Sequence, residues 1–117
     1  MSAENPPQFV YKIVPEAVEE PFPAELPLSE LDRKDGFIHL STAELVLGTC
    51  DRYFSHTTKI YLLKLDFAKT VSRTKWENGF PHLYGNFGRE EIVDSKAFER
   101  SASETWSESL KRSEWLV

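Results

Sequence analysis

A cluster of four prolines is the strongest constraint on what this chain can fold into. The β-rich run of residues 9–14 is followed by Pro15, Pro21, Pro23 and Pro27. Each proline fixes φ and removes a backbone N–H, so this density excludes a long helix. Proline also ends the preceding strand, because it cannot donate to the ladder of a sheet. The sequence therefore predicts a strand at residues 9–14 and an irregular connection after it.

Helical and strand patterns alternate along the next part of the chain. Ser29 and Gly36 stand where the N-cap and the C-terminal glycine of a short helix are expected. Residues 37–40 are a short apolar strand, after which Ser41 and Glu44 have the spacing of a capping box. Apolar residues at helical spacing then predict one buried helix face through about residue 54. These residues are Ala43, Val46, Leu47, Cys50 and Phe54.

Strand signals dominate the region that follows. Residues 59–67 form the strongest apolar strand pattern of the chain, and shorter strands are predicted at residues 74–77 and around residues 92–93. The Asn-Gly pair after residue 77 predicts a turn. Residues 80–85 are flanked by proline and glycine, so we expect an irregular loop there.

The C-terminal part of the sequence predicts one more helix. Ser101 and Glu104 again have capping-box spacing, and Trp106 and Leu110 lie four residues apart on one helix face. We expect this helix at about residues 103–115. The complete order of strands and helices is typical of an α+β fold.

Length and composition place the chain among ordinary globular proteins. Its 117 residues, 40% of them hydrophobic, predict one domain at residues 9–117 after a flexible tail at residues 1–8. The single cysteine excludes an internal disulfide framework. No apolar run approaches the roughly 20 residues that a membrane helix needs, and no signal pattern opens the chain. We therefore expect a soluble, cytoplasmic protein with no membrane partner.

Charge is distributed unevenly along the sequence. The net charge is −5, and residues 16–35 carry seven acids and two bases, whereas residues 52–75 carry six bases and one acid. The basic segment either attracts an anionic ligand or is a solvated strand face. The overall acidity argues against duplex nucleic acid as the main partner.

His39 stands just before the helix that Ser41 is predicted to open. The first N–H groups of a helix lack partners and attract anions, and the hydroxyls of Ser41 and Thr42 lie beside them. A strand-to-helix corner with these residues suits a phosphorylated or nucleotide ligand. The alternative is a core histidine bonded to a backbone carbonyl, with Ser41 serving only as a cap.

His82 and Tyr84 offer an imidazole and a phenol two residues apart. They lie in the predicted loop of residues 80–85, and loops on a rigid scaffold often carry binding groups. Histidine can donate or accept a proton near neutral pH. The alternative is a loop in which Tyr84 only covers the edge of the core.

Three further residues are weaker candidates for ligand binding. Glu77 next to Trp76 can orient a sugar hydroxyl or stabilise a developing cation, and Arg52 can pair with a phosphate. A core Trp76, a strand-end Glu77 and a surface Arg52 are the alternatives. No glycine-rich phosphate motif and no close pair of metal ligands occurs, so we expect no metal. Cys50 lies on the apolar helix face, which predicts an inert thiol.

Several ordered motifs resemble the domain-of-unknown-function family nine-five-two. They are GFIHLSTAE at residues 36–44, RYF at 52–54, YLLKLD at 61–66, WE at 76–77 and FPHLYG at 80–85. The resemblance extends over roughly residues 9–95. Membership of this family implies no particular function.

A more distant resemblance concerns the second half of RNA 2′-phosphotransferases, which have the ADP-ribosyltransferase-like fold. The residues that carry it are His39-Leu40-Ser41, the helix with Gly48 and Arg52, and the apolar strand after them. It implies a small domain of mainly antiparallel strands in two small sheets with two to three helices. It also implies a cleft that binds NAD.

The second resemblance assigns roles to the candidate residues. His39 would contact the adenosine ribose or the pyrophosphate, with Ser41 and Thr42 beside it. Tyr84 or Trp76 would supply an aromatic wall, and His82 or Glu77 would occupy the late catalytic position. The implied chemistry is ADP-ribosyl transfer at the nicotinamide–ribose bond, with an oxocarbenium-like sugar stabilised by the protein. The usual late glutamate motif and the RNA-reading half of the phosphotransferases are both missing.

The sequence therefore leaves two possible functions, which belong to different classes. The first is a site for NAD or an ADP-ribose-like ligand, with or without turnover, formed by His39, Ser41, His82 and Tyr84. The second is a protein-interaction domain that uses the acidic, proline-rich residues 15–35 and the C-terminal tryptophans. The positions of the two histidines discriminate between them, because only the first function requires both rings at one solvent-lined hollow.

Overall fold

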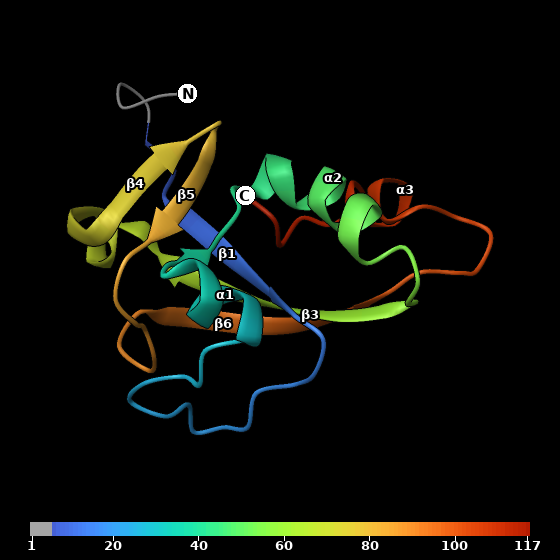
Figure 1. Ribbon diagram of the computed structural model, residues 1–117. Helices are drawn as coiled ribbons and strands as arrows, with labels where there is room; N and C mark the ends of the chain where they lie inside the picture. The colour runs from blue at the N-terminus through green and yellow to red at the C-terminus, as the bar shows by residue number, and fades with distance from the viewer. Residues whose placement is uncertain (1–5) are drawn as a thin grey trace.

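The alternating strand and helix patterns fold into two three-stranded antiparallel sheets and three short α-helices (Figure 1). The computed structural model describes residues 6–117, so the first five residues of the predicted tail lie outside the described residues. The strands are β1 (Phe9–Val14), β2 (Ile38–His39), β3 (Lys59–Asp66), β4 (Thr74–Glu77), β5 (Phe80–Leu83) and β6 (Ile92–Glu99), and the helices are α1 (Glu30–Asp35), α2 (Ala43–Tyr53) and α3 (Trp106–Leu110). The strand orders are β1-β3-β6 and β2-β5-β4, and the predicted α+β class is confirmed.

β3 is apolar along most of its length because both of its faces are covered. Leu63 and Leu65 are buried in a core that includes Ile38 and Leu83 of the smaller sheet. Ile60 and Leu62 are buried in a second core, to which α2 and α3 contribute. A continuous apolar run is typical of a strand that is buried on both sides. The larger sheet is therefore the middle layer between the helices and the smaller sheet.

The smaller sheet is built on a tight hairpin between β4 and β5. Asn78 and Gly79 both have positive φ, 54° and 83°, as a two-residue hairpin turn requires. The expected irregular loop at residues 80–85 is wrong for its first four residues, because residues 80–83 form the central strand β5. Pro81 accepts a hydrogen bond from the backbone N–H of Leu40 but has no N–H to return. The β2–β5 ladder therefore ends after two residue pairs.

α2 begins one residue later than the capping-box spacing predicts. Its N-cap is Thr42, whose hydroxyl accepts from the N–H of Leu45. Ser41 instead forms an isolated β-bridge, in which its backbone N–H and C=O pair with those of Tyr11. This bridge ties the end of β2 to β1 and keeps Ser41 out of the cap.

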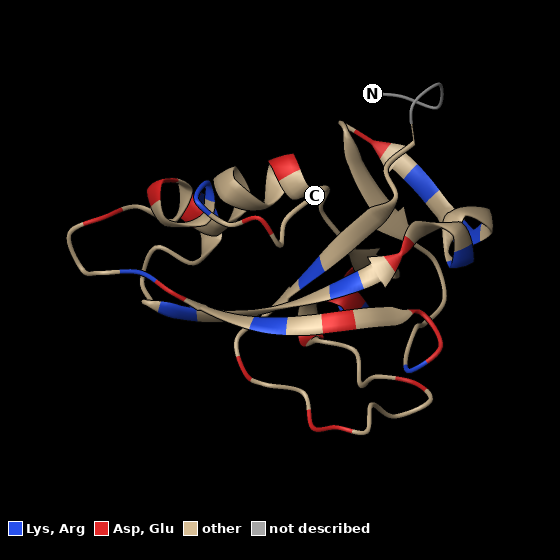
Figure 2. Cartoon of the chain, turned by 180° about the vertical axis from the view of Figure 1, so that it is seen from behind, with Lys and Arg blue, Asp and Glu red and all other residues tan. Residues whose placement is uncertain are grey.

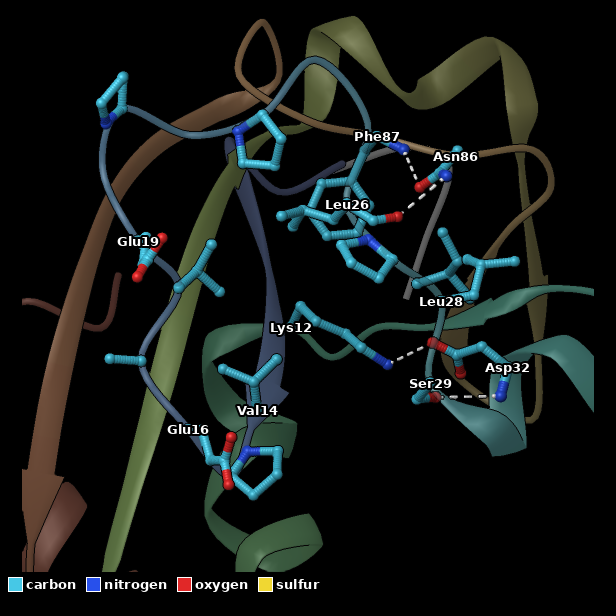
Figure 3. Close-up of a pocket in the computed structure, with 17 residues that line it drawn as sticks. Lys12, Val14, Glu16, Glu19, Leu26, Leu28, Ser29, Asp32, Asn86 and Phe87 are labelled. Carbon is cyan, nitrogen blue, oxygen red and sulfur yellow. Dashed lines mark hydrogen bonds and ion pairs between the residues drawn. The ribbon is translucent and has the colours of Figure 1, made fainter.

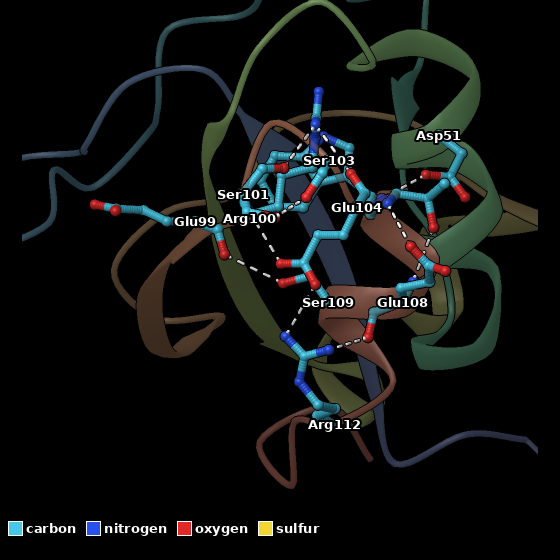
Figure 4. A network of polar contacts seen from close by, with 11 residues as sticks. Asp51, Glu99, Arg100, Ser101, Ser103, Glu104, Glu108, Ser109 and Arg112 are labelled. Atoms are coloured by element: carbon cyan, nitrogen blue, oxygen red, sulfur yellow. Dashed lines mark hydrogen bonds and ion pairs between the residues drawn. The ribbon is translucent and has the colours of Figure 1, made fainter.

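α3 is shorter than predicted and begins at a different capping box. Thr105 and Glu108 form the box, whereas Ser101 and Glu104 close only a turn before the helix. The carboxylate of Asp51 accepts from the backbone N–H groups of Trp106 and Ser107, which anchors the start of α3 on α2 (Figure 4). A negative charge at this end of a helix is also favourable for its dipole.

The segment after α3 returns to the larger sheet instead of continuing as a helix. Trp115 packs against Tyr11 and Phe98 with ring centroids 5.7 Å apart in both pairs. The ammonium of Lys64 lies 4.4 Å from the Trp115 ring centroid and 4.9 Å from that of Phe9. Cation–π contacts of this kind hold the C-terminal segment in place.

Cys50 lies on the buried face of α2, as predicted, and burial raises the pKa of its thiol to about 12. Only the thiolate reacts with disulfide reagents. We expect the folded protein to show no reaction with a disulfide reagent at pH 8 over the time in which the urea-unfolded chain reacts completely. Absorbance of the released thiolate measures both rates, and prompt reaction of the folded protein would contradict the buried position.

Candidate functional site

The two candidate histidines lie opposite each other on neighbouring strands of the smaller sheet. His39 on β2 pairs with His82 on β5, and Lys75 on β4 pairs with His82 from the other side. Directly opposite residues of antiparallel strands point to the same face. The rings of His39 and His82 are 6.0 Å apart between centroids. The structure therefore brings together two imidazoles that are far apart in the sequence.

This outward face of the smaller sheet, which we call the imidazole face, is distinct from the core side. Ile38, Leu83 and Trp76 point to the core between the sheets. The imidazole face alternates with them along each strand, as the two-residue period of a strand dictates. It comprises Phe37, His39, Lys75, Glu77, His82 and Tyr84.

The imidazole of His39 is oriented by Asp32, which lies in α1. Nδ1 of His39 is 2.5 Å from Oδ1 of Asp32, and the backbone N–H of His39 donates to the same oxygen over 3.2 Å. The other carboxylate oxygen accepts from the ammonium of Lys12 on β1 at 2.6 Å. Asp32 is only 2% exposed, so these contacts satisfy a buried carboxylate.

The hydrogen bonds to Asp32 also determine its ionisation. Burial by itself would raise the pKa of Asp32, but the hydrogen bonds from Lys12 and His39 outweigh that effect and lower it. The ionised carboxylate fixes the ring of His39 in one orientation. This is the arrangement in which a base or a binding imidazole is held by a third group.

The second nitrogen of His39 points toward solvent and meets another carboxylate. Nε2 lies 3.0 Å from Oδ2 of Asp35, the last residue of α1, and both side chains are 35% exposed. A neutral imidazole has a single N–H and cannot donate to two carboxylates at once. Both ring nitrogens of His39 thus face carboxylate oxygens, Nδ1 that of Asp32 and Nε2 that of Asp35.

His82 has a different environment from His39. Phe37 stacks on its ring with centroids 4.1 Å apart and an interplanar angle of 9°. Burial is the main reason that the pKa of His82 is lowered, although Glu77 acts in the opposite direction from 3.6 Å away. Nδ1 of His82 is buried without a hydrogen-bond partner among the described residues. The face thus combines a carboxylate-bound imidazole with a neutral, stacked one.

Of the predicted binding residues, Tyr84 and Glu77 lie on this face. The Tyr84 ring is 5.6 Å from that of Phe37 and 5.4 Å from the ammonium of Lys75. The structure does not bring Trp76 to the imidazoles, because Trp76 points to the core and contacts Phe67 with centroids 5.8 Å apart.

The three predicted residues from the α2 region also lie away from the face. Ser41 is buried at the bridge to β1, and Thr42 is engaged as the cap of α2. Arg52 is in the last turn of α2, at the opposite end of the helix, where its guanidinium lies 5.9 Å from the ring of Tyr53.

The basic segment 52–75 does not form one positive surface. Lys59 pairs with Glu99, Arg73 with Glu91, and Lys64 is enclosed by aromatic rings. Acidic residues, in contrast, follow one another along the connection after β1 (Figure 2). Only Lys75 of the basic segment reaches the imidazole face.

Sequence reasoning missed the residues that hold His39. The polar partners are Lys12, Asp32 and Asp35, and the aromatic one is Phe37. Asp32 follows the N-cap Ser29 by three residues, which is the spacing of a capping-box residue. The sequence therefore suggests a capping role for Asp32 and does not reveal its contact with His39.

A hollow of about 600 Å³ lies between β1 and the proline-rich connection (Figure 3). Its lining is mainly apolar and shares only Lys12 and Asp32 with the polar chain that reaches His39. Asn86 joins the connection to the loop after β5, because its amide donates to the carbonyl of Leu26. The hollow includes neither imidazole, so it is not the solvent-lined hollow at both rings that we expected from the sequence for a nucleotide site.

Within residues 6–117, no cluster of three His, Cys, Asp or Glu side chains has the geometry to hold a metal ion. None of the helices in that range is both long and apolar enough to span a bilayer.

The structure is that of a small α+β protein with two antiparallel sheets, and two imidazoles are paired on the smaller one. The chain belongs to the family described as "Protein of unknown function (DUF952)", whose model matches residues 12–95. This match confirms the first family resemblance. No curated protein sequence matches the chain.

The fold is also found in solved structures of a bacterial protein. The crystal structure of protein CC0527 from Caulobacter crescentus is 27% identical, with a TM-score of 0.70 over 83% of this chain and 91% of that one. Its solution NMR structure is 26% identical, with a TM-score of 0.67 over 84% and 90% of the two chains.

Proposed function

We propose that the imidazole face binds a nucleotide-type ligand of the NAD or ADP-ribose class. The observation that carries the proposal is the pairing of His39 and His82 across β2 and β5, with rings 6.0 Å apart and side chains that are 35% and 14% exposed. The resemblance to the ADP-ribosyltransferase-like fold supplies the ligand class, and the chemistry of the face is compatible with it.

Each part of such a ligand has a matching group on the face. Phe37 and Tyr84 offer rings on which a base or a nicotinamide can stack. The imidazoles and the carboxylate of Glu77 suit ribose hydroxyls, which both donate and accept hydrogen bonds. The ammonium of Lys75 lies 5.4 Å from the centroid of the Tyr84 ring and suits a phosphate.

The proposed activity is ADP-ribosyl transfer. The bond between nicotinamide and ribose C1′ breaks with its electron pair leaving on nicotinamide. An acceptor nucleophile supplies the electron pair of the new bond to C1′ and releases its proton to solvent. The charge that develops on the ribose is positive, and Glu77, whose carboxylate lies 3.6 Å from Nδ1 of His82, would stabilise it. No covalent bond to the protein is needed for this step.

Thermal and urea unfolding with ADP-ribose or NAD tests the proposal. A ligand at a hundredfold excess over its Kd should stabilise the protein by ~2.7 kcal/mol. His39→Ala should abolish this gain. His56→Ala is the matched control, because His56 lies in the loop before β3 and is exposed, and it should leave the gain unchanged. A full response of the His39→Ala variant would exclude His39 from the site.

The interaction-domain alternative gains less support. Trp106 is fully buried and its indole donates to the carbonyl of Phe54. Trp115 is half-buried against Tyr11 and donates to Asp94. Both C-terminal tryptophans therefore pack within the molecule, and only the acidic connection after β1 is left to serve a partner protein.

A further inference from the structure

On the imidazole face, the solvent-facing nitrogen of His39, Nε2, already contacts a carboxylate of the protein. Nε2 contacts Oδ2 of Asp35 at 3.0 Å, while Nδ1 is held by the buried Asp32. Any ligand oxygen that binds His39 from solvent must approach this same nitrogen. The carboxylate of Asp35 therefore stands where a ligand oxygen would have to be.

The stability of α1 does not require a carboxylate at the position of Asp35. Asp35 is the last helical residue, followed by the C-cap Gly36 with φ of 84°. A negative charge in the last turn of a helix is mildly unfavourable for the helix dipole. Arg33 and Lys34 have the favourable sign there. The contact that Asp35 makes in this structure is with His39.

Asp32 and Asp35 differ in their freedom to move. Asp32 is 2% exposed and is fixed by Lys12 and His39, whereas Asp35 is 35% exposed. An exposed charge pair of this kind contributes little stability, so a ligand can displace it at small cost. Asp32 thus positions the ring, and Asp35 is a replaceable partner of its outer nitrogen.

We propose that Asp35 is an intramolecular competitor that occupies the ligand-binding nitrogen of His39 until an oxygen of the ligand displaces it. This inference rests on the proposed function and adds its regulation: affinity at this face is set partly by the contact between Asp35 and His39. Displacement of the carboxylate frees Nε2 of His39 for a phosphate or a hydroxyl oxygen of the ligand.

The test compares Asp35→Ala with wild type in titrations with ADP-ribose, inorganic pyrophosphate and adenosine. Removing the competitor should tighten binding of ADP-ribose by about two- to fivefold, the range expected for loss of an exposed charge pair. Glu30→Gln on the same helix is the matched control, because it also removes one negative charge but Glu30 makes no contact with His39. Its affinity should stay at the wild-type value.

The two small probes identify the displacing oxygen. A gain shared by ADP-ribose and pyrophosphate assigns it to phosphate, and a gain shared by ADP-ribose and adenosine assigns it to a ribose hydroxyl. Either pattern supports the competitor. Equal or weaker ADP-ribose binding by Asp35→Ala, with wild type binding normally, would overturn it and leave the proposed function intact.

A ligand-free measurement separates the inference from the proposed function. The imidazole ¹⁵N shifts of His39 should change in Asp35→Ala and stay constant in Glu30→Gln, because only the former loses the Nε2 contact. Unchanged shifts in Asp35→Ala would show that the contact does not exist in solution and would overturn the inference directly. If the shifts change but neither wild type nor variant binds ADP-ribose or NAD, the proposed function fails and the competitor has nothing to compete with.

Discussion

Trp106→Ala is expected to destabilise the protein by roughly 3–5 kcal/mol, the range for removing a large buried aromatic side chain. Trp106 is completely buried between α2 and the larger sheet. Its indole N–H donates to the carbonyl of Phe54 at 2.8 Å, so the substitution also leaves that acceptor without its partner. Urea unfolding followed by far-UV circular dichroism measures the change in free energy of unfolding.

Two further variants show which part of the effect is packing. Trp106→Phe keeps most of the buried volume and loses the hydrogen bond, so its expected cost is about 1–3 kcal/mol. Trp115→Ala makes the same change of residue at a half-buried position and is expected to cost less than Trp106→Ala. A loss below about 1 kcal/mol for Trp106→Ala would contradict its place in the core.

The contact between α3 and α2 explains why the C-terminal helix was only partly predictable. Helical spacing correctly indicated that Trp106 and Leu110 face the core together. The sequence, however, contains two capping boxes four residues apart, and local spacing cannot rank them. Asp51, more than fifty residues earlier, selects the second box by accepting from the N–H groups at the start of α3.

In the smaller sheet, too, the local sequence did not predict a conformation that depends on a distant element. Proline and glycine around residues 80–85 predicted a loop, because proline is usually excluded from central strands. Pro81 is tolerated in β5 because the neighbouring strand β2 ends at that level, so only one ladder hydrogen bond is lost. That compensation depends on the length of β2, which no feature near Pro81 reveals.

The sequence singled out the two imidazoles of the candidate site but not the side chains that contact them. His39 and His82 stood out because each interrupts an apolar or turn-rich segment, and the β2–β5 register places them opposite each other. Register between segments forty residues apart follows from the packing of the whole sheet. The same packing turns Trp76 toward the core and moves Asp32 under His39.

Asp32→Ala is expected to cost roughly 3–5 kcal/mol at pH 7, as for the removal of one partner from a buried ion pair. The ammonium of Lys12, 14% exposed, would lose its carboxylate, and the backbone N–H and Nδ1 of His39 would lose their acceptor. Asp35→Ala is the matched control, since the same substitution at an exposed pair should cost less than about 1 kcal/mol.

The pH dependence of this loss tests its electrostatic origin. The pKa of Asp32 is lower in the folded protein than its ordinary value of 3.8, so ionised Asp32 stabilises the fold at any pH above that value. The contribution disappears as the pH falls through the lower, folded-state pKa. The difference in unfolding free energy between wild type and Asp32→Ala should therefore shrink as the pH falls below about pH 4. Urea unfolding at pH 7, 5 and 3 measures it, and a difference that stays the same at pH 3 would show that lost packing, and not the charge, accounts for the effect.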